Sequence, residues 1–402
     1  MTGSRSGGIS NANDFLEEYY LNDPGNHPPS HFKDKMSDLR FNMRNYLLKF
    51  TDTQSIYLAE WQKEHRTISL DTFFAYTALL ASHTFYVLFL PIPPFIGQYG
   101  LIRDLVYILG YSIYISGYLK DYWCLPRPKS PPLHRITLSA YTSKEYGAPS
   151  SHTANATGVT LLLILRIYQA RYMTFTMKCV LLFFTFAYDF TLIIGRLYCG
   201  MHGLIDLISG AIIGILCFAG RIGIPWIFKN FKSGDYLWYP IFTVCWGFFM
   251  LFNHVKPIDE CPCFEDSVAF IGVLAGLDFS NWFIERYDLS HTIDALSQND
   301  GRITPILLKL AVGIPCVIIW KYVIGKPLVY LTLQKIIGVQ DDRPSKKMLR
   351  KRYKKVHRHE CLPYIGVAKL DIYGRFFIYA GIPITVLLIS PIALQAFGLI
   401  NL

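Results

Sequence analysis

The sequence predicts an all-α membrane protein, a polytopic bundle of helices that crosses the bilayer about eight times. The chain has 402 residues, of which 52% are hydrophobic and only 17% are charged. Its mean hydropathy is positive, and this composition is too apolar for an ordinary water-soluble globule. Apolar runs approach the roughly 20 residues that a helix needs to cross a bilayer, at residues 73–95, 101–119, 152–168, 176–195, 204–222, 237–252, 303–324 and 374–397.

A shorter apolar stretch at residues 268–277 has acids close on both sides, Asp266 and Asp278. It is too short for a span, so we expect a re-entrant or interfacial segment. The chain then divides into four regions: a polar N-terminal segment (1–70) with an amphipathic surface helix at 39–57, a catalytic membrane core (71–255), a loop with the re-entrant segment (256–302), and C-terminal spans (303–402) with a basic loop at 335–372.

The net charge of +10 would suggest a nucleic-acid partner in a soluble protein. Here the basic residues gather in loops beside spans, where they act as topology signals, so we exclude nucleic acid. The side that should be cytoplasmic carries Arg166, Arg171, Lys178, Arg221, Lys229 and Lys232. The basic stretch at 346–358 is expected on that side too, and the motifs described next on the lumenal side.

Three motifs should meet at one face of the membrane: Lys120-x6-Arg127-Pro128, Pro149-Ser150-Ser151-His152 and Arg196-x5-His202-x3-Asp206. The first two share one loop, and two predicted spans lead from that loop out and back to the third. A phosphate monoester carries one to two negative charges and needs several fixed cations together with hydroxyl or amide donors. Serines that begin a helix place its free amide groups beside their own hydroxyls. The expected phosphate ligands are Lys120, Arg127, Ser150, Ser151 and Arg196.

The two histidines suit the two roles that phosphoester cleavage requires. Asp206 lies four residues after His202, on the same helical face, so its carboxylate can hold one imidazole nitrogen and leave the other free to attack phosphorus. His152 is expected to protonate the departing alkoxide. Cys199-Gly200 should break the helix so that Arg196 and His202 face one phosphate. No carboxylate cluster accompanies the motifs, so we expect neither a metal nor another cofactor.

Nine cysteines are present, and only Cys261-Pro262-Cys263 lies in a polar loop. The second cysteine pair of a structural zinc site is missing. We therefore favour a redox-sensitive pair or free thiols over a metal site.

The three motifs resemble the signature of the type-2 phosphatidic acid phosphatase superfamily, with Ser151 in place of a glycine and Gly195 in place of a serine. Residues 120–132 and 146–152 resemble the sphingosine-1-phosphate phosphatase branch, most of all the fungal dihydrosphingosine-1-phosphate phosphatases. The resemblance implies a six-helix phosphatase core, metal independence, residence in the endoplasmic reticulum membrane and the residue roles given above.

The first hypothesis for function is hydrolysis of sphingosine, dihydrosphingosine or phytosphingosine 1-phosphate, which enters from the bilayer, through a phosphohistidine intermediate. Three alternatives stay open. They are a broad lipid phosphate phosphatase acting on phosphatidate or diacylglycerol pyrophosphate, a phosphotransferase, and a non-catalytic lipid scaffold or transporter.

Overall fold

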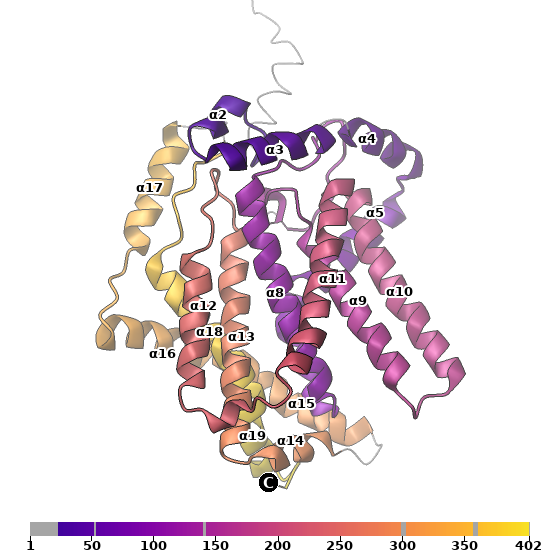
Figure 1. Cartoon of the computed structure of the whole chain (residues 1–402), viewed down its shortest axis with the longest axis vertical. Helices are drawn as coiled ribbons and strands as arrows, with labels where there is room; N and C mark the ends of the chain where they lie inside the picture. Colours follow the sequence, from indigo (N-terminus) through magenta and orange to yellow (C-terminus); the bar gives the residue numbers. More distant parts are fainter. Residues whose placement is uncertain (1–22, 52–53, 140–141, 299–302, 357–360, 402) are drawn as a thin grey trace, which may run out of the picture.

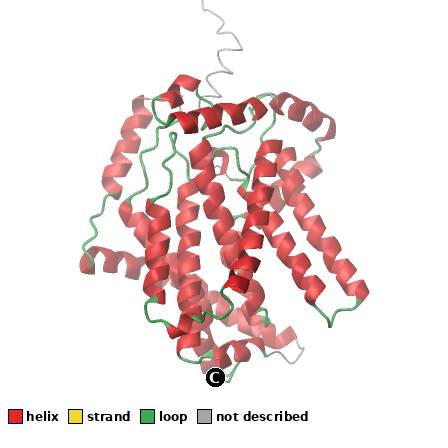
Figure 2. Cartoon of the chain, viewed as in Figure 1, coloured by secondary structure: helices red, strands yellow, loops and turns green. Residues whose placement is uncertain are grey.

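Long helices run side by side through the molecule, and short helices lie across one of its ends (Figure 1). The computed structural model describes residues 23–51, 54–139, 142–298, 303–356 and 361–401. Helices and loops account for this described part, in which the single β pairing is an isolated bridge between Asp259 and Pro363 (Figure 2). The predicted all-α membrane bundle is confirmed.

The elements follow the chain in three groups. The N-terminal group comprises α2 (Pro29–Lys33), α3 (Asp38–Thr51), α4 (Gln54–His65), α5 (Ile68–Thr77), η1 (Ala78–Ala81), α6 (His83–Phe89) and α7 (Ile92–Phe95). The central group comprises α8 (Tyr99–Trp123), η2 (Thr142–Lys144), α9 (Ser151–Gln169), α10 (Phe175–Tyr198), α11 (Leu204–Ile227), η3 (Ser233–Asp235) and α12 (Tyr239–Phe252). The C-terminal group comprises α13 (Cys263–Arg286), α14 (Ser290–Ser297), α15 (Ile303–Ile318), η4 (Ile319–Ile324), α16 (Gly325–Leu331), η5 (Thr332–Ile336), α17 (Arg343–Val356), α18 (Lys369–Ile384), η6 (Thr385–Ile389) and α19 (Ser390–Ala396).

Five helices of the described chain are long and apolar enough to cross a membrane: α10, α11, α13, the continuous stretch Ile303–Ile336, and the continuous stretch Lys369–Ala396. The number of eight crossings stays a prediction. The first expected span, residues 73–95, is divided among α5, η1, α6 and α7. Its break lies at Ser82, which adopts an extended backbone and caps α6 by accepting a hydrogen bond from the amide of Phe85 at 3.2 Å.

The expectation of a short re-entrant segment at 268–277 is wrong, because these residues form the middle of the 24-residue helix α13. The flanking acids do not end the helix, since the bundle supplies partners for two of the three, Glu265 and Asp278. Glu265 pairs with Arg375 at 2.6 Å, and Asp278 accepts a hydrogen bond from Tyr107.

This additional crossing changes the position of the basic stretch, which forms α17. Arg350 of α17 pairs with Glu260 at 2.6 Å, and Glu260 directly precedes the loop that leads into α13. Helix α17 therefore lies at the same end of the bundle as the three motifs (Figure 1), and its expected place on the opposite side is wrong.

Close approaches between helices fix the centre of the bundle. A methyl group at Gly276 of α13 would overlap the carbonyl oxygen of Ala380 in α18, and one at Gly214 of α11 would overlap that of Ala154 in α9. Small residues commonly permit such backbone contact between membrane helices. The contact between α9 and α11 holds the second motif, which begins α9, against the third.

The predicted amphipathic helix at 39–57 is present as two helices, α3 and α4, that lie across the motif end (Figure 1). Its arginines do not face solvent. Arg40 donates to the carbonyl oxygens of Asp121 and Tyr122 at 2.5 and 2.6 Å, where α8 ends with unpaired carbonyl groups and a partial negative charge. Helix α3 therefore caps the helix that carries Lys120.

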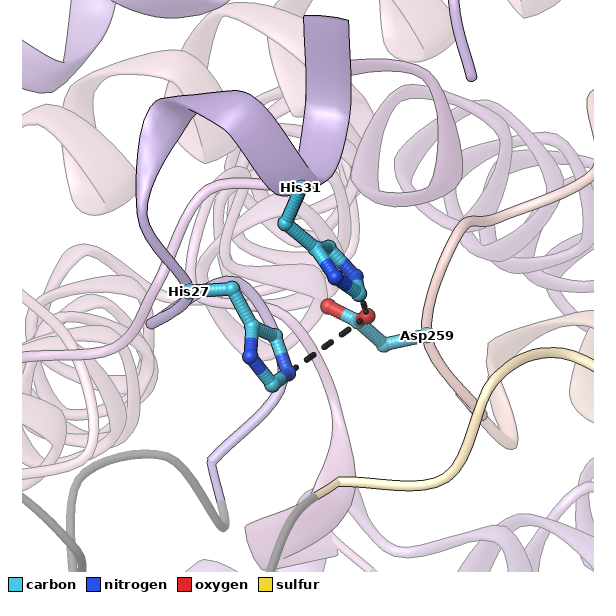
Figure 3. Close-up of side chains that lie close together, drawn as sticks. All are labelled: His27, His31 and Asp259. Carbon is cyan, nitrogen blue, oxygen red and sulfur yellow. Dashed lines mark hydrogen bonds and ion pairs between the residues drawn. The ribbon is translucent and has the colours of Figure 1, made fainter. Parts of the chain in front are cut away.

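The segment before α3 is tied to the loop between α12 and α13. Figure 3 shows the imidazoles of His27 and His31 on the carboxylate of Asp259, at 3.7 and 2.8 Å from the same oxygen. The other oxygen accepts a hydrogen bond from the amide of Gly25 at 2.9 Å, and the amide of Asp259 donates to the hydroxyl of Tyr146 at 2.9 Å. Tyr146 connects this attachment to the loop before the second motif.

Candidate active site

The three motifs meet beneath α3 and α4, at one end of the bundle. The Nη1 atom of Arg127, in the first motif, lies 3.2 Å from the Nε2 atom of His202, in the third motif. The amide of Ser150 in the second motif donates to the carbonyl oxygen of Asp206 at 2.8 Å. The expectation that distant parts of the chain converge here is confirmed.

The first motif spans the end of α8 and the extended segment that follows. Lys120 lies in the last turn of α8 and is buried. Arg127 follows the helix end, and its guanidinium donates to the carbonyl oxygens of Glu145, Met201 and Thr142 at 2.9, 2.6 and 2.9 Å. These bonds orient the arginine toward the third motif.

Glu145 is the anion that these cations hold in the structure. Its carboxylate pairs with Lys120 and lies 3.7 Å from the Nη2 atom of Arg127. All three side chains are buried. A substrate phosphate that uses Lys120 and Arg127 therefore meets a carboxylate already in contact with both.

The second motif begins α9. Ser150 is the N-cap, and its hydroxyl accepts a hydrogen bond from the amide of Thr153 at 3.3 Å. Ser151 and His152 form the first turn and line a cavity. A helix N-terminus offers amide donors and a positive partial charge, so this turn favours an anion.

The third motif is a helix end, a tight turn and a helix start. Helix α10 ends at Tyr198, and Gly200 has a φ of +62°, a conformation that glycine adopts readily. The carbonyl oxygen of Arg196 then accepts hydrogen bonds from the amides of Met201 and His202 at 3.1 and 3.3 Å. The expected break at Cys199-Gly200 is confirmed, and it brings His202 back toward the end of α10.

Asp206 contacts His202 as predicted, but the expected shared helical face is wrong, because His202 lies in the turn before α11. Its Oδ2 atom lies 3.3 Å from the Nδ1 atom of His202 and accepts a hydrogen bond from the amide of Gly203 at 2.9 Å. We assign the proton to Nδ1, because a carboxylate only accepts hydrogen bonds. The Nε2 atom then carries the lone pair, on the side that faces Arg127.

Charge and burial favour this neutral imidazole. Burial lowers the pKa of His202 well below its usual value, and the positive charges of Arg127, Lys120 and Arg196 lower it further. Burial also lowers the pKa of Arg127, to about 10, although Glu145 opposes the shift. Burial and the charges of Arg196, Lys120 and Arg127 also lower the pKa of His152 well below its usual value. At neutral pH the site without substrate thus combines two uncharged imidazoles with a charged guanidinium.

Arg196 completes the set of cations. Its Nε atom is buried and has no hydrogen-bond partner among the described residues, and its side chain lines the cavity together with Ser151, His152 and Glu145. The cavity encloses about 1830 Å³ of empty space, part of it open to the surroundings. A buried arginine donor beside an open cavity favours an anionic ligand.

A second, mainly apolar cavity adjoins the first. It has about 580 Å³ of empty space, part of it open to the surroundings, and both cavities are lined by Tyr86, Phe270 and Tyr379. An alkyl chain attached to a phosphate at the motifs could therefore continue between α6, α13 and α18.

In the described part of the chain, two groups of three side chains have the spacing to hold a metal ion: His27 with His31 and Asp259, and Asp121 with Cys261 and Cys263. Neither group contains a residue of the three motifs. Cys261 and Cys263 are joined by a disulfide, in agreement with the redox-sensitive pair that the sequence favours.

Sequence analysis missed two residues that shape the site. Glu145 lies outside every motif, and only its place five residues before Ser150 could have drawn attention to it. Gln62 of α4 donates to the carbonyl oxygens of His134 and Tyr198 at 2.7 Å each, which ties the loop after the first motif to the end of α10. No local pattern identifies that role.

Comparisons with known proteins agree with this geometry. The model of the PAP2 superfamily matches residues 101–232, a stretch that contains all three motifs. The dihydrosphingosine 1-phosphate phosphatase YSR3 of Saccharomyces cerevisiae is 52% identical over 93% of this chain and 92% of its own length. A dihydrosphingosine 1-phosphate phosphatase of Schizosaccharomyces pombe is 35% identical over 70% of this chain and 69% of its own.

More distant relatives extend the comparison. The human sphingosine-1-phosphate phosphatase 2 is 27% identical over 61% of this chain and 62% of its own length. No solved structure matches the chain. The chain belongs to the PAP2 superfamily, in the family of the dihydrosphingosine 1-phosphate phosphatases.

Proposed function

We propose that the protein hydrolyses phosphorylated long-chain sphingoid bases, including sphingosine, dihydrosphingosine and phytosphingosine 1-phosphate, to the free base and phosphate. The observation that carries this proposal is the position of His202, with Asp206 on one imidazole nitrogen and Arg127 beside the other. The relatives act, by their names, on phosphates of this kind. The apolar cavity next to the site offers a place for one long alkyl chain.

The substrate phosphate binds to Lys120, Arg127 and Arg196, with Ser150 and Ser151 at the start of α9 supplying further donors. The Nε2 lone pair of His202 attacks phosphorus, and the bond to the ester oxygen breaks. The negative charge of the bound phosphate favours the protonated form of His152. His152 then donates a proton to the departing alkoxide, which leaves as the free base. The product of this first step is a phosphohistidine on His202.

Water completes the reaction. His152, now neutral, takes a proton from the water as it attacks phosphorus, the bond to Nε2 breaks, and inorganic phosphate leaves. Asp206 stabilises the positive charge that His202 carries while phosphorylated. No step requires a metal ion or another cofactor.

A substrate panel with the purified protein tests the assignment. We expect hydrolysis of sphingoid base 1-phosphates in the presence of a chelator, inhibition by vanadate, and slower turnover of phosphatidate and diacylglycerol pyrophosphate. His202→Ala should abolish turnover, and His152→Ala should slow release of the base. Equal, mild losses in the two variants, or a requirement for added magnesium, would contradict the mechanism.

We also propose that the protein resides in the endoplasmic reticulum membrane with the motif end facing the lumen. The other end carries Arg166 in the last turn of α9, Arg221 in α11, and Arg171, Lys229 and Lys232 in loops, which supports a cytoplasmic position for that end. Helix α17 carries an opposing excess of basic residues at the motif end. Glycosylation tags inserted after Ser139 and after Arg171 separate the two orientations, since only the lumenal tag is modified.

A further inference from the structure

Asp266 is an acid that the proposed reaction does not use, although it lines the same cavity as His152 and Arg196. It lies in the first turn of α13, next to Glu265. Acids in a first turn often interact only with the helix dipole, and Glu265 already pairs with Arg375 at 2.6 Å. Among the described residues, the carboxylate of Asp266 has neither a hydrogen bond nor an ion pair.

The surroundings of Asp266 make an unpaired carboxylate costly. Helix α13 is apolar enough to cross the membrane and is largely buried by its neighbours. Ionisable groups in such segments generally serve binding or transport. Glu145, Arg375, Glu265 and Lys120 are the charged groups that act on Asp266. Asp266 also shares its cavity with Glu145 and Arg196 of the phosphate site.

The two charged groups of the expected substrate have opposite signs. Its phosphate carries one to two negative charges and suits the cations Lys120, Arg127 and Arg196. A sphingoid base 1-phosphate also carries an ammonium group, on the carbon adjacent to the one that bears the phosphate, and this group offsets part of that charge.

We propose that the carboxylate of Asp266 binds the protonated amine of sphingoid base phosphates and thereby selects them over lipid phosphates that lack an amine. The inference rests on the proposed function and adds a specificity-determining residue to it. An ammonium group supplies the donors that the Asp266 carboxylate lacks, and a substrate bound through its phosphate at Arg196 places that group in the same cavity.

The test compares two substrates in each variant: dihydrosphingosine 1-phosphate, and octadecyl phosphate, which has a long chain and no amine. In Asp266→Asn, kcat/KM should fall about 10- to 100-fold for the amine substrate, as for a lost charge-assisted hydrogen bond. It should stay within about 2-fold of wild type for octadecyl phosphate. Retained hydrolysis of octadecyl phosphate shows in the same sample that the variant is folded.

Two further variants serve as controls for charge and position. Glu265→Gln removes the same charge one residue away, where Arg375 already provides a partner, and should leave the preference for the amine unchanged. Asp266→Glu keeps the charge and should retain most of the preference. Equal losses for both substrates in Asp266→Asn, or no loss for either, would overturn the inference. Failure of folded wild-type protein to hydrolyse either substrate would instead refute the proposed function.

Discussion

Glu145→Gln is the substitution that most directly probes how the site holds an anion. The wild-type carboxylate pairs with Lys120 and lies 3.7 Å from Arg127, and all three groups are buried. At that separation two unit charges interact by about 4 kcal/mol for an effective dielectric constant of 20. An arriving phosphate has to displace this interaction or bind next to a like charge.

Replacing the carboxylate by an amide removes that competition and keeps a side chain of similar size. We expect the inhibition constants of inorganic phosphate and vanadate to fall roughly 10- to 100-fold, because only part of the Coulomb energy survives reorganisation of the site. Both constants can be measured by competition against dihydrosphingosine 1-phosphate in detergent micelles. Glu265→Gln, which alters a carboxylate of the same cavity that pairs with Arg375, serves as control and should leave them unchanged. Unchanged or weaker phosphate inhibition in Glu145→Gln would refute the reasoning.

Three further outcomes are expected. Because the pKa of His202 is lowered in the folded protein, the acid limb of kcat/KM should have its midpoint below about pH 6.5, and a midpoint above 7 would be inconsistent with a buried neutral imidazole. The contribution of neutral His202 to the free energy of unfolding is fully present above that pH and is lost as the pH falls toward the folded-state pKa. Gly276→Val should lower the melting temperature by forcing α13 away from α18, at a cost of at least about 1–3 kcal/mol, whereas Gly220→Ala, where an added methyl meets nothing within 4 Å, should change it little. Asp259→Asn should weaken the attachment of His31 and increase proteolysis in residues 23–37, before α3. Unchanged cleavage there would contradict this expectation.

Local patterns made the chemistry of the site predictable. The spacing of His202 and Asp206 predicts their contact, although His202 precedes α11 and the two do not share a helical face. The glycine at position 200 predicts the turn that returns His202 toward Arg196. Each of these inferences uses residues close in sequence, where few intervening residues limit what can touch.

Features that depend on tertiary packing were not predictable from the sequence. Glu265 and Asp278 beside the stretch 268–277 indicated a segment too polar to cross. The sequence does not show that Arg375 and Tyr107 are their partners. The position of α17 depends on whether α13 runs the full length of the bundle. The prediction for α17 was therefore wrong for the same reason. Glu145 reaches Lys120 only because the loop before α9 folds back over the end of α8.

The central claim is that His202 attacks phosphorus. Rapid quenching of the protein with substrate labelled on its phosphate should trap a phosphoenzyme that is stable in alkali and labile in acid, with the label located on His202 by mass spectrometry and absent from His202→Ala. A burst of released base without any labelled protein, or label on another residue, would contradict the account.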